Sequence, residues 1–280
     1  MIFAIVVNFT RPHAKELAND IVRYLQQNDV EVVAADDQVS ELAVKPMSAV
    51  DPKAIDFLIS FGGDGSILSV IHKYPHIDAP IMGVNLGTLG FLADVSPSSL
   101  YASIDQVLAG KYSVQERLML KGTKDGVASC LGVNEMVVHR GPNHSLVDIG
   151  LWVDGVYFNT FSADGVIVST PSGSTAYSLS AGGPIVDPLL DCLLITPICP
   201  HALSNRPIVL KMPQQIEIQY LSSASPVEVA FDGMCRFSLQ PKEKFSISAA
   251  DRRFRLVSVE GYDYFATLRS KLNWTGSLRN

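Results

Sequence analysis

The chain has 280 residues, of which 47% are hydrophobic and 18% are charged, and its formal net charge at pH 7 is -6. This composition is typical of a folded globular protein and excludes a disordered chain. The negative charge, with no run of Lys or Arg, argues against a nucleic-acid partner, and no stretch approaches the ~20 apolar residues of a membrane span.

Apolar strand-like runs alternate with amphipathic segments in the first third of the chain. The pattern predicts strands over residues 2–7, 31–35, 54–61 and 80–85. It predicts helices over residues 14–27 and 66–73. The first run is short and has no basic segment before it, so we interpret it as a buried strand and not a signal peptide. The alternation is typical of a parallel sheet flanked by helices. Because neither a signal peptide nor a membrane span is predicted, we expect a cytoplasmic protein.

The texture changes near residue 117 to short runs rich in Val, Ile, Phe and Tyr, separated by turn-forming residues. Such runs predict strands over residues 147–153, 156–161, 166–169, 216–220, 227–231, 245–249 and 254–259. A last helix is predicted over residues 262–272. We therefore expect two domains, with a boundary near residue 115.

The turn Gly62-Gly63-Asp64-Gly65 follows a hydrophobic strand and precedes a helix. It directs backbone amides and the positive end of the helix at one point, where glycines let a phosphate approach closely. A carboxylate beside phosphates is repulsive unless it binds their metal or accepts a proton, so Asp64 is the informative residue. A tight turn with Asp as a turn former explains the local sequence equally well.

Two commoner phosphate motifs are absent. The sequence has no Gly-x-x-x-x-Gly-Lys-Ser/Thr, and Gly83, Gly87 and Gly90 are not spaced as Gly-x-Gly-x-x-Gly. The segment His139-Arg140-Gly141 lacks the Asp of a protein-kinase catalytic loop. A nucleotide enzyme of another type remains.

The polar pair Asn134-Glu135 interrupts an apolar, strand-like run. Neighbours on a strand point to opposite faces, so one side chain would face a core unless the backbone is irregular there, which suggests a site. An edge strand with both side chains in water is the alternative.

A second polar stretch begins at Asp164-Gly165 and continues through the hydroxyl-rich residues 169–184. Residues 175–180 can start a helix, with Ser172 or Ser174 as its N-cap. A helix start rich in hydroxyls suits an adenine and a ribose, although an ordinary solvated loop has the same composition.

The four cysteines, at positions 130, 192, 199 and 235, form no Cys-x-x-Cys pair and have no histidines at zinc-ligand spacing. We expect buried free thiols in a reducing compartment.

Five segments, taken together and in order, resemble the NAD kinase family over essentially the whole chain. They are residues 62–65, 83–92, 134–135, 164–184 and 195–207. The resemblance implies an α/β plus all-β fold: an N-terminal α/β nucleotide-binding domain (residues 1–115, joined by the C-terminal segment 258–280) and a C-terminal β-sandwich domain that binds NAD (residues 116–257).

The resemblance also implies roles. Asp64 corresponds to the family's proton acceptor, Asn134 and Glu135 hold the adenosine ribose, and Asp164 lies toward the nicotinamide. The remaining nucleotide-binding positions are Gly63, Gly65, Phe91, Ser172, Thr175, Ala176, Tyr177, Ser178, Leu179 and Ser180. The chain departs from many relatives at Ser145, at Ser162, where relatives often have Arg, and at Met234.

The implied reaction is phosphorylation of the 2′-hydroxyl of the adenosine ribose of NAD to give NADP. ATP, or another donor such as polyphosphate, supplies the phosphoryl group with a divalent metal, Mg²⁺. The resemblance assigns no metal ligands and favours a homo-oligomer, a dimer or a tetramer.

Three alternatives stay open. A lipid kinase of the diacylglycerol or sphingosine type shares the glycine turn and the two-domain plan, but the hydroxyl-rich stretch favours a nucleotide. A phosphofructokinase-like enzyme conflicts with the β-rich second half. A non-catalytic NAD-binding sensor would keep the pocket without turnover.

Overall fold

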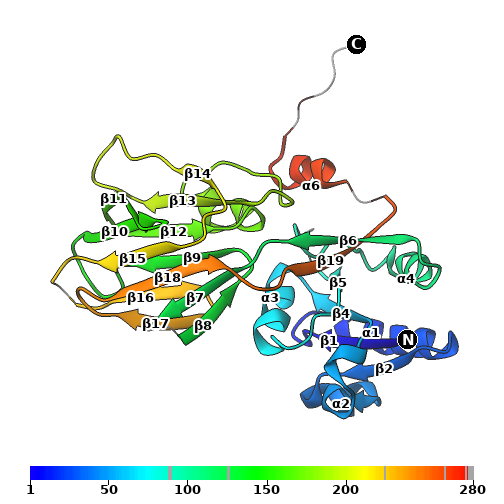
Figure 1. Cartoon of the computed structure of the whole chain (residues 1–280). Coiled ribbons are helices and arrows are strands. Elements are labelled where there is room, and N and C mark those ends of the chain that lie inside the picture. The colour runs from blue at the N-terminus through cyan, green and yellow to red at the C-terminus, as the bar shows by residue number, and fades with distance from the viewer. Residues whose placement is uncertain (88–89, 125–126, 224, 262, 275, 277–280) are drawn as a thin grey trace. The chain divides into compact units, whose positions relative to one another are not determined.

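A computed structural model describes residues 1–280 except 88–89, 125–126, 224, 262, 275 and 277–280, and leaves the side chains of 127–129 undescribed. The chain divides into two compact units, residues 1–115 with 255–280 and residues 116–254. Figure 1 labels the elements of both.

Unit 1 contains a seven-stranded sheet in the order β3-β2-β1-β4-β5-β19-β6. Its strands are β1 (Ile2–Val7), β2 (Glu31–Ala34), β3 (Lys45–Pro46), β4 (Phe57–Gly62), β5 (Ile81–Asn85), β6 (Tyr112–Arg117) and β19 (Phe254–Val259). Its α-helices are α1 (Ala14–Gln27), α2 (Val39–Leu42), α3 (Asp64–Lys73), α4 (Leu100–Leu108) and α6 (Tyr264–Lys271). Short 3-10 helices span Asp36–Gln38, Met47–Ala49 and Pro52–Ala54.

Helices cover both faces of this sheet. Alternate residues of β1, including Phe3 and Ile5, share one hydrophobic cluster with α1 and α4. On the opposite face, Gly83 of β5 leaves room for Ile67 of α3. Every residue of β4 and β5 is therefore buried, as expected for parallel strands covered on two sides.

The strand order places a topological switch point between β1 and β4. The chain moves from β1 to β2 on one side and then returns to β4 on the other, and both neighbours of β1 run parallel to it. Ligands of open α/β sheets bind outside the carboxyl ends of the strands at such a point. The glycine turn follows the carboxyl end of β4.

Unit 2 contains two six-stranded sheets, in the orders β11-β10-β15-β18-β7-β8 and β14-β13-β12-β9-β16-β17. The strands of the first are β7 (Leu120–Lys124), β8 (Val127–Gly132), β10 (Val147–Val153), β11 (Val156–Ala163), β15 (Ile216–Tyr220) and β18 (Lys244–Ala249). Those of the second are β9 (Glu135–His139), β12 (Gly165–Ser169), β13 (Cys192–Ile198), β14 (Ile208–Lys211), β16 (Val227–Phe231) and β17 (Cys235–Leu239). The 3-10 helix Ser172–Thr175 and α5 (Tyr177–Ser180) follow β12.

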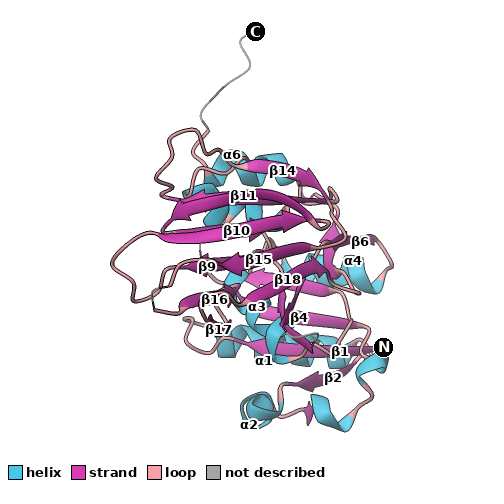
Figure 2. Cartoon of the chain, turned by 60° about the vertical axis from the view of Figure 1, so that its left-hand side comes forward, coloured by secondary structure: helices cyan, strands magenta, loops and turns pink. Residues whose placement is uncertain are grey.

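Inner residues of both sheets of unit 2 form one hydrophobic cluster. It joins Leu151 and Ile218 of the first sheet to Val138 and Val166 of the second. The pairings of these strands are antiparallel, and Figure 2 shows strands as the dominant element of this unit. The unit is a β-sandwich, so the α/β plus all-β prediction is confirmed.

Several local predictions need correction. The strand predicted over residues 54–61 begins at Phe57, because Pro52–Ala54 form a 3-10 turn in which Asp51 accepts the amide of Lys53 (2.9 Å). Neither Ser172 nor Ser174 is an N-cap. The Ser174 hydroxyl instead accepts from the amide of Val186 and donates to its carbonyl.

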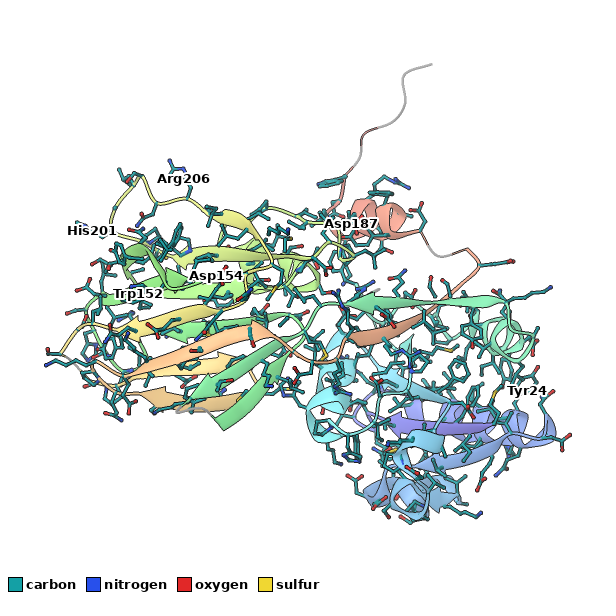
Figure 3. All side chains as sticks on the ribbon, in the orientation of Figure 1. Tyr24, Trp152, Asp154, Asp187, His201 and Arg206 are labelled. Carbon is teal, nitrogen blue, oxygen red and sulfur yellow. A yellow bond between two sulfur atoms is a disulfide. The ribbon has the colours of Figure 1, made fainter. Side chains whose placement is uncertain are left out.

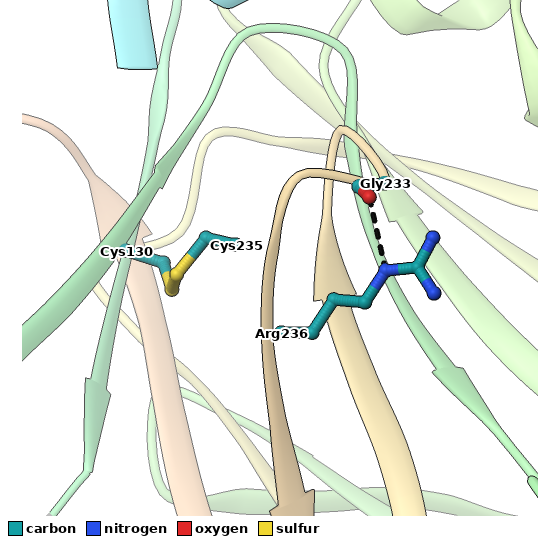
Figure 4. Close-up of a disulfide and its surroundings, with 4 residues drawn as sticks. All are labelled: Cys130, Gly233, Cys235 and Arg236. Atoms are coloured by element: carbon teal, nitrogen blue, oxygen red, sulfur yellow. Dashed lines mark hydrogen bonds between the residues drawn. A yellow bond between two sulfur atoms is a disulfide. The ribbon is translucent and has the colours of Figure 1, made fainter. Parts of the chain in front are cut away.

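The cysteine prediction is wrong for three of the four residues. Cys130 of β8 and Cys235 of β17 form a disulfide, with Cα atoms 6.1 Å apart, as Figure 4 shows. The bridge joins the edge strands of the two sheets of unit 2. Cys192 is a buried thiol, as expected, but Cys199 is exposed. The two cysteines are 105 positions apart in the sequence, and only the stacking of the two sheets brings them together. The local spacing of the cysteines therefore could not reveal the bridge.

Candidate functional site

A cavity of about 840 Å³ lies at the switch point of unit 1. Its lining includes Asn8 after β1, the glycine turn after β4 and Asn85 at the end of β5. A Cβ on Gly62 would overlap Ser66, so that glycine is required by packing. A Cβ on Gly63 or Gly65 would meet no atom within 4 Å, so these two glycines keep the backbone at the start of α3 uncovered.

Asp64, the first residue of α3, points its carboxylate at the loop that follows β5. Its Oδ2 accepts the amide of Phe91 (2.8 Å), and its Oδ1 accepts the amides of Leu92 (3.0 Å) and Ala93 (2.8 Å). A Cβ on Gly90 would overlap Oδ1, so the loop closes on the carboxylate only with glycine there. Three of about four lone-pair positions are occupied, and one remains for a ligand.

The predicted residues of unit 1 therefore come together. Gly63, Asp64 and Gly65 line the cavity, and Phe91 contributes its amide to Asp64. Thr88 and Leu89, which belong to the predicted 83–92 segment, lie outside the described residues.

Asn134 and Glu135 lie where a bend leads into β9, so the predicted irregularity is present. The edge-strand alternative is wrong, because β9 lies between β12 and β16 and Glu135 is 9% exposed. Asp232, in the turn between β16 and β17, fixes the bend. Its carboxylate accepts the amides of Val133 (2.8 Å), Asn134 (2.8 Å) and Glu135 (3.1 Å).

Glu135 is an unusual carboxyl group. Burial, and next the negative charge of Asp232, raise its pKa to about 8, although a hydrogen bond from the Tyr177 amide acts in the opposite direction. Among the described residues its Oε2 has no hydrogen-bond partner. A buried oxygen without a partner is suited to accept a hydrogen bond from a ligand.

A second cavity, of about 360 Å³, follows one face of β9 from Glu135 through Val137 to His139. Tyr177 and Asp232 also line it. The hydroxyl-rich loop packs at its Glu135 end, because Thr170 donates its amide to the Asn134 carbonyl (2.8 Å) and its hydroxyl to the Val133 carbonyl (2.6 Å).

The predicted residues of that loop differ in exposure. Tyr177 and Ser180 are exposed, and Thr175, Ala176 and Leu179 are half-buried. Ser172 is buried, and its hydroxyl has no partner among the residues the structure describes. Ser178 is fully buried, with its hydroxyl bonded to Thr196 (2.9 Å) and its carbonyl accepting the Gly183 amide (2.8 Å), so the structure gives it no atom that faces a ligand.

Asp164 lies near the opposite end of β9 from Glu135. Its neighbour Gly165 pairs with His139, whereas Ser169 pairs with Glu135. The two pairs are four positions apart along β9, or about 13 Å. The Nε of Arg140 lies 2.8 Å from Asp164 Oδ1, and the Arg140 amide donates to the Asp164 carbonyl (2.9 Å).

Sequence reasoning missed Asp232 and the cations around the cavity of unit 1. Asp232-Gly233 has the composition of an ordinary turn, and only the fold shows that its carboxylate serves a segment far earlier in the chain. Arg11, Lys73 and Lys271 line the first cavity, although no cluster of basic residues marks them in the sequence.

Outside the undescribed positions, no group of three or more His, Cys, Asp or Glu side chains is arranged to hold a metal ion. None of the helices that the structure describes is long and apolar enough to span a bilayer.

An open parallel sheet with a glycine turn at its switch point defines a class of nucleotide-phosphate-binding protein. Comparison with known proteins defines the family. Residues 3–112 match the ATP-NAD kinase N-terminal domain, and residues 133–259 match the ATP-NAD kinase C-terminal domain. This chain belongs to the NAD kinase family.

Individual relatives are similar over most of their length. The NAD kinase of Protochlamydia amoebophila (strain UWE25) is 49% identical over 276 residues, 99% of each chain. The NAD kinase of Geotalea daltonii is 43% identical over 227 residues, 80% of each chain.

Two solved structures share the fold. Yeast NADH kinase complexed with NADH has a TM-score of 0.88 at 27% identity, covering 100% of this chain and 89% of that one. An NAD kinase from Archaeoglobus fulgidus in complex with ATP has a TM-score of 0.76 at 29% identity, covering 99% and 100%.

Proposed function

We propose that this chain transfers the γ-phosphoryl group of ATP to the 2′-hydroxyl of the adenosine ribose of NAD, giving NADP. Unit 1 binds the phosphates of the donor, and unit 2 binds NAD. The observation that carries the proposal is the Asp64 carboxylate, fixed at the start of α3 inside the switch-point cavity.

Asp64 acts mainly by position. A carboxylate is a weak base for a ribose hydroxyl. Phosphoryl transfer passes through a loose transition state, so alignment and charge stabilisation lower most of the barrier, and the proton leaves late. The three loop amides hold the carboxylate in one orientation, and its remaining lone pair orients the 2′-hydroxyl and finally accepts its proton.

Unit 2 presents the acceptor. Glu135 and Asn134 bind the adenosine ribose at one end of β9, and Tyr177 lines the same cavity. Asp164, about 13 Å away along the strand, is placed to meet the nicotinamide end of an elongated dinucleotide. Arg140 holds Asp164 in place through the contact between its Nε and Asp164 Oδ1 (2.8 Å).

We expect Mg²⁺ to bind together with the donor nucleotide. Within the described lining of the first cavity Asp64 is the one carboxylate, so the residues do not form a protein metal cage. Mg²⁺ usually keeps several waters and binds largely through substrate phosphates. When bound, it would neutralise phosphate charge, held mainly by the donor phosphates and water, because the one remaining lone pair of Asp64 faces the 2′-hydroxyl.

The direct test measures NADP formed by the purified chain from NAD and Mg²⁺ with either ATP or polyphosphate. Asp64→Asn should lower turnover by ~10² to 10⁴. Asn also turns an amide N–H toward the loop donors, so melting temperature and ATP binding must be measured in parallel. Asp20→Asn, which removes a surface carboxylate paired only with Arg23 in the described structure, controls for net charge. A near-normal rate in Asp64→Asn contradicts the proposed role.

The same preparation tests the rival functions. Phosphorylation of diacylglycerol in place of NAD would identify a lipid kinase. A thermal shift with NAD but no NADP would identify a sensor. The proposal also includes a cytoplasmic homo-oligomer, a dimer or a tetramer, and the oligomeric state of the same preparation can be measured by light scattering.

A further inference from the structure

Three cationic side chains, Arg11, Lys73 and Lys271, line the switch-point cavity of unit 1 around Asp64. The chain as a whole carries a formal charge of -6. Positive potential for a polyphosphate must therefore come from local groups such as these.

The three cations differ in their partners. Lys73 forms an ion pair with Asp37 (Nζ to Oδ2, 3.0 Å), which raises the pKa of Lys73. Arg11 belongs to the loop after β1, and its guanidinium has no ion-pair partner among the described residues. The Lys271 ammonium likewise has none among them, so neither charge is neutralised by a neighbouring carboxylate.

The Lys271 ammonium is placed by an aromatic ring. Its Nζ lies 5.5 Å from the centroid of the Phe91 ring, a cation–π distance. The backbone amide of Phe91 donates to Asp64. The residue that positions the ammonium is therefore the one that helps to fix the carboxylate. A cation–π contact leaves the ammonium N–H donors available.

Lys271 could serve only to stabilise the C-terminal end of α6. It is the last residue of α6, where a positive charge interacts favourably with the helix dipole. Arg269 lies in the same last turn, pairs with Asp263, the N-cap residue of α6 (3.4 Å), and does not line the cavity. The helix end thus already has a basic residue, and the dipole does not explain why a second one faces the cavity.

We infer that Lys271 binds the phosphates of the donor nucleotide, and this inference rests on the proposed function. Strand β19 returns the chain to the sheet of unit 1, and α6 then brings Lys271 to the glycine turn. An ammonium on a flexible stem is a point charge that suits phosphate oxygens. It complements the uncovered amides at Gly63 and Gly65.

Steady-state kinetics of the full chain test the inference. Lys271→Met should raise KM for ATP about 10- to 100-fold, the loss of one charged hydrogen bond, with KM for NAD unchanged. Lys271→Arg should recover part of the loss. Arg269→Gln is the matched control, because it removes the other basic residue of the same helix turn, and it should keep both constants.

A binding measurement avoids dependence on turnover. Inorganic tripolyphosphate should raise the melting temperature of the native chain and of Arg269→Gln, and much less that of Lys271→Met. Should Lys271→Met fail to fold, Lys271→Gln carries the same comparison. An unchanged KM for ATP with an unchanged tripolyphosphate shift overturns the inference and leaves the kinase function intact. If the native chain forms no NADP, the proposed function fails, and the tripolyphosphate shift alone decides the role of Lys271.

Discussion

Burial of Glu135 favours its protonated form, whereas its proposed role in ribose binding favours the ionised form. Its carboxyl group is buried beside Asp232, and its pKa is raised to about 8 from a usual value of 4.5. Near neutral pH the free protein therefore holds this group largely protonated. A ribose diol donates its hydrogens and binds the ionised form better, so NAD affinity should increase as the pH rises toward and through 8.

Glu135→Gln should separate stability from binding. The pKa of Glu135 is higher in the folded than in the unfolded state, so its stabilising contribution is present below pH 4.5 and is lost as the pH rises through about 8. Glutamine cannot ionise. The variant should therefore gain stability over the native chain between pH 5 and pH 9, by a few kcal/mol at most. Its NAD affinity should fall roughly 10-fold.

Thermal melts across this pH range and NAD titrations at pH 8 provide the measurements. Glu228→Gln is the control, since Glu228 lines the same cavity but is exposed and paired with Arg236 (3.4 Å). The stability of Glu228→Gln relative to the native chain should not increase as the pH rises. Unchanged NAD affinity in Glu135→Gln would mean that the ribose role is misassigned.

The residues predicted from sequence were those with a local signal. Asp64 lies between glycines, and Asn134 and Glu135 interrupt an apolar run. Their positioning groups have no such signal. The amides that hold Asp64 are chemically ordinary backbone, and Asp232 lies 97 positions after Glu135.

At the scale of elements, two Asp-Gly turns of unit 2 have the same backbone conformation at Asp but differ in the number of hydrogen bonds that the Asp carboxylate accepts. Asp154 joins β10 to β11, and Asp232 joins β16 to β17; both have φ of 49°. Asp154, labelled in Figure 3, is exposed and accepts one backbone amide, that of Gln215 (2.9 Å). Asp232 accepts three, all from the bend that carries Asn134 and Glu135.

Alanine substitution at these turns should therefore give unequal effects. Asp232→Ala removes the acceptor of three amides, at about 1 kcal/mol or more each, so its free energy of unfolding should fall by about 3 kcal/mol or more. Asp154→Ala leaves one exposed amide to water, and its loss should be smaller by about 2 kcal/mol or more. The left-handed backbone penalises alanine equally at both positions, so the difference isolates the hydrogen bonds.

Urea unfolding of both variants checks the stability difference, and NAD titration checks its consequence. Only Asp232→Ala should also weaken NAD binding, because only that turn fixes the bend before β9. Equal losses of stability in the two variants would show that the turn conformation, and not the three hydrogen bonds, is what matters.

Element prediction succeeded where side-chain periodicity was strong. The helix over 14–27 was predicted with the bounds of α1, which buries Ala18, Ile21 and Leu25 at spacings of three and four. Strand β13 was not predicted, because Pro197 lies within it and proline lacks the amide that a sheet ladder uses. All seven residues of β13 are buried, so tertiary packing decides its conformation.

At the scale of the whole molecule, unit 2 is continuous in sequence and unit 1 is not. Unit 1 consists of residues 1–115 and 255–280, and unit 2 occupies the chain between them. The strands of both sheets of unit 2 lie within residues 116–254. The sheet of unit 1, in contrast, needs β19, which lies between β5 and β6. The sequence pattern predicted an α/β part and a β-rich part. It could not predict the strand order, because that order depends on long-range pairing that periodicity does not encode.

The two units should consequently differ in their ability to fold alone. A fragment of residues 116–254 retains two complete sheets around one core, so it should unfold cooperatively in urea with a free energy within the ~5–15 kcal/mol of ordinary domains. A fragment of residues 1–115 loses β19, which leaves β5 without one neighbour and β6 without its partner in the sheet. It should show no cooperative transition by circular dichroism until a peptide of residues 255–280 is added. A cooperative transition of 1–115 alone would show that the first five strands suffice, and that the returning segment serves the cavity through Lys271 more than the stability of the sheet.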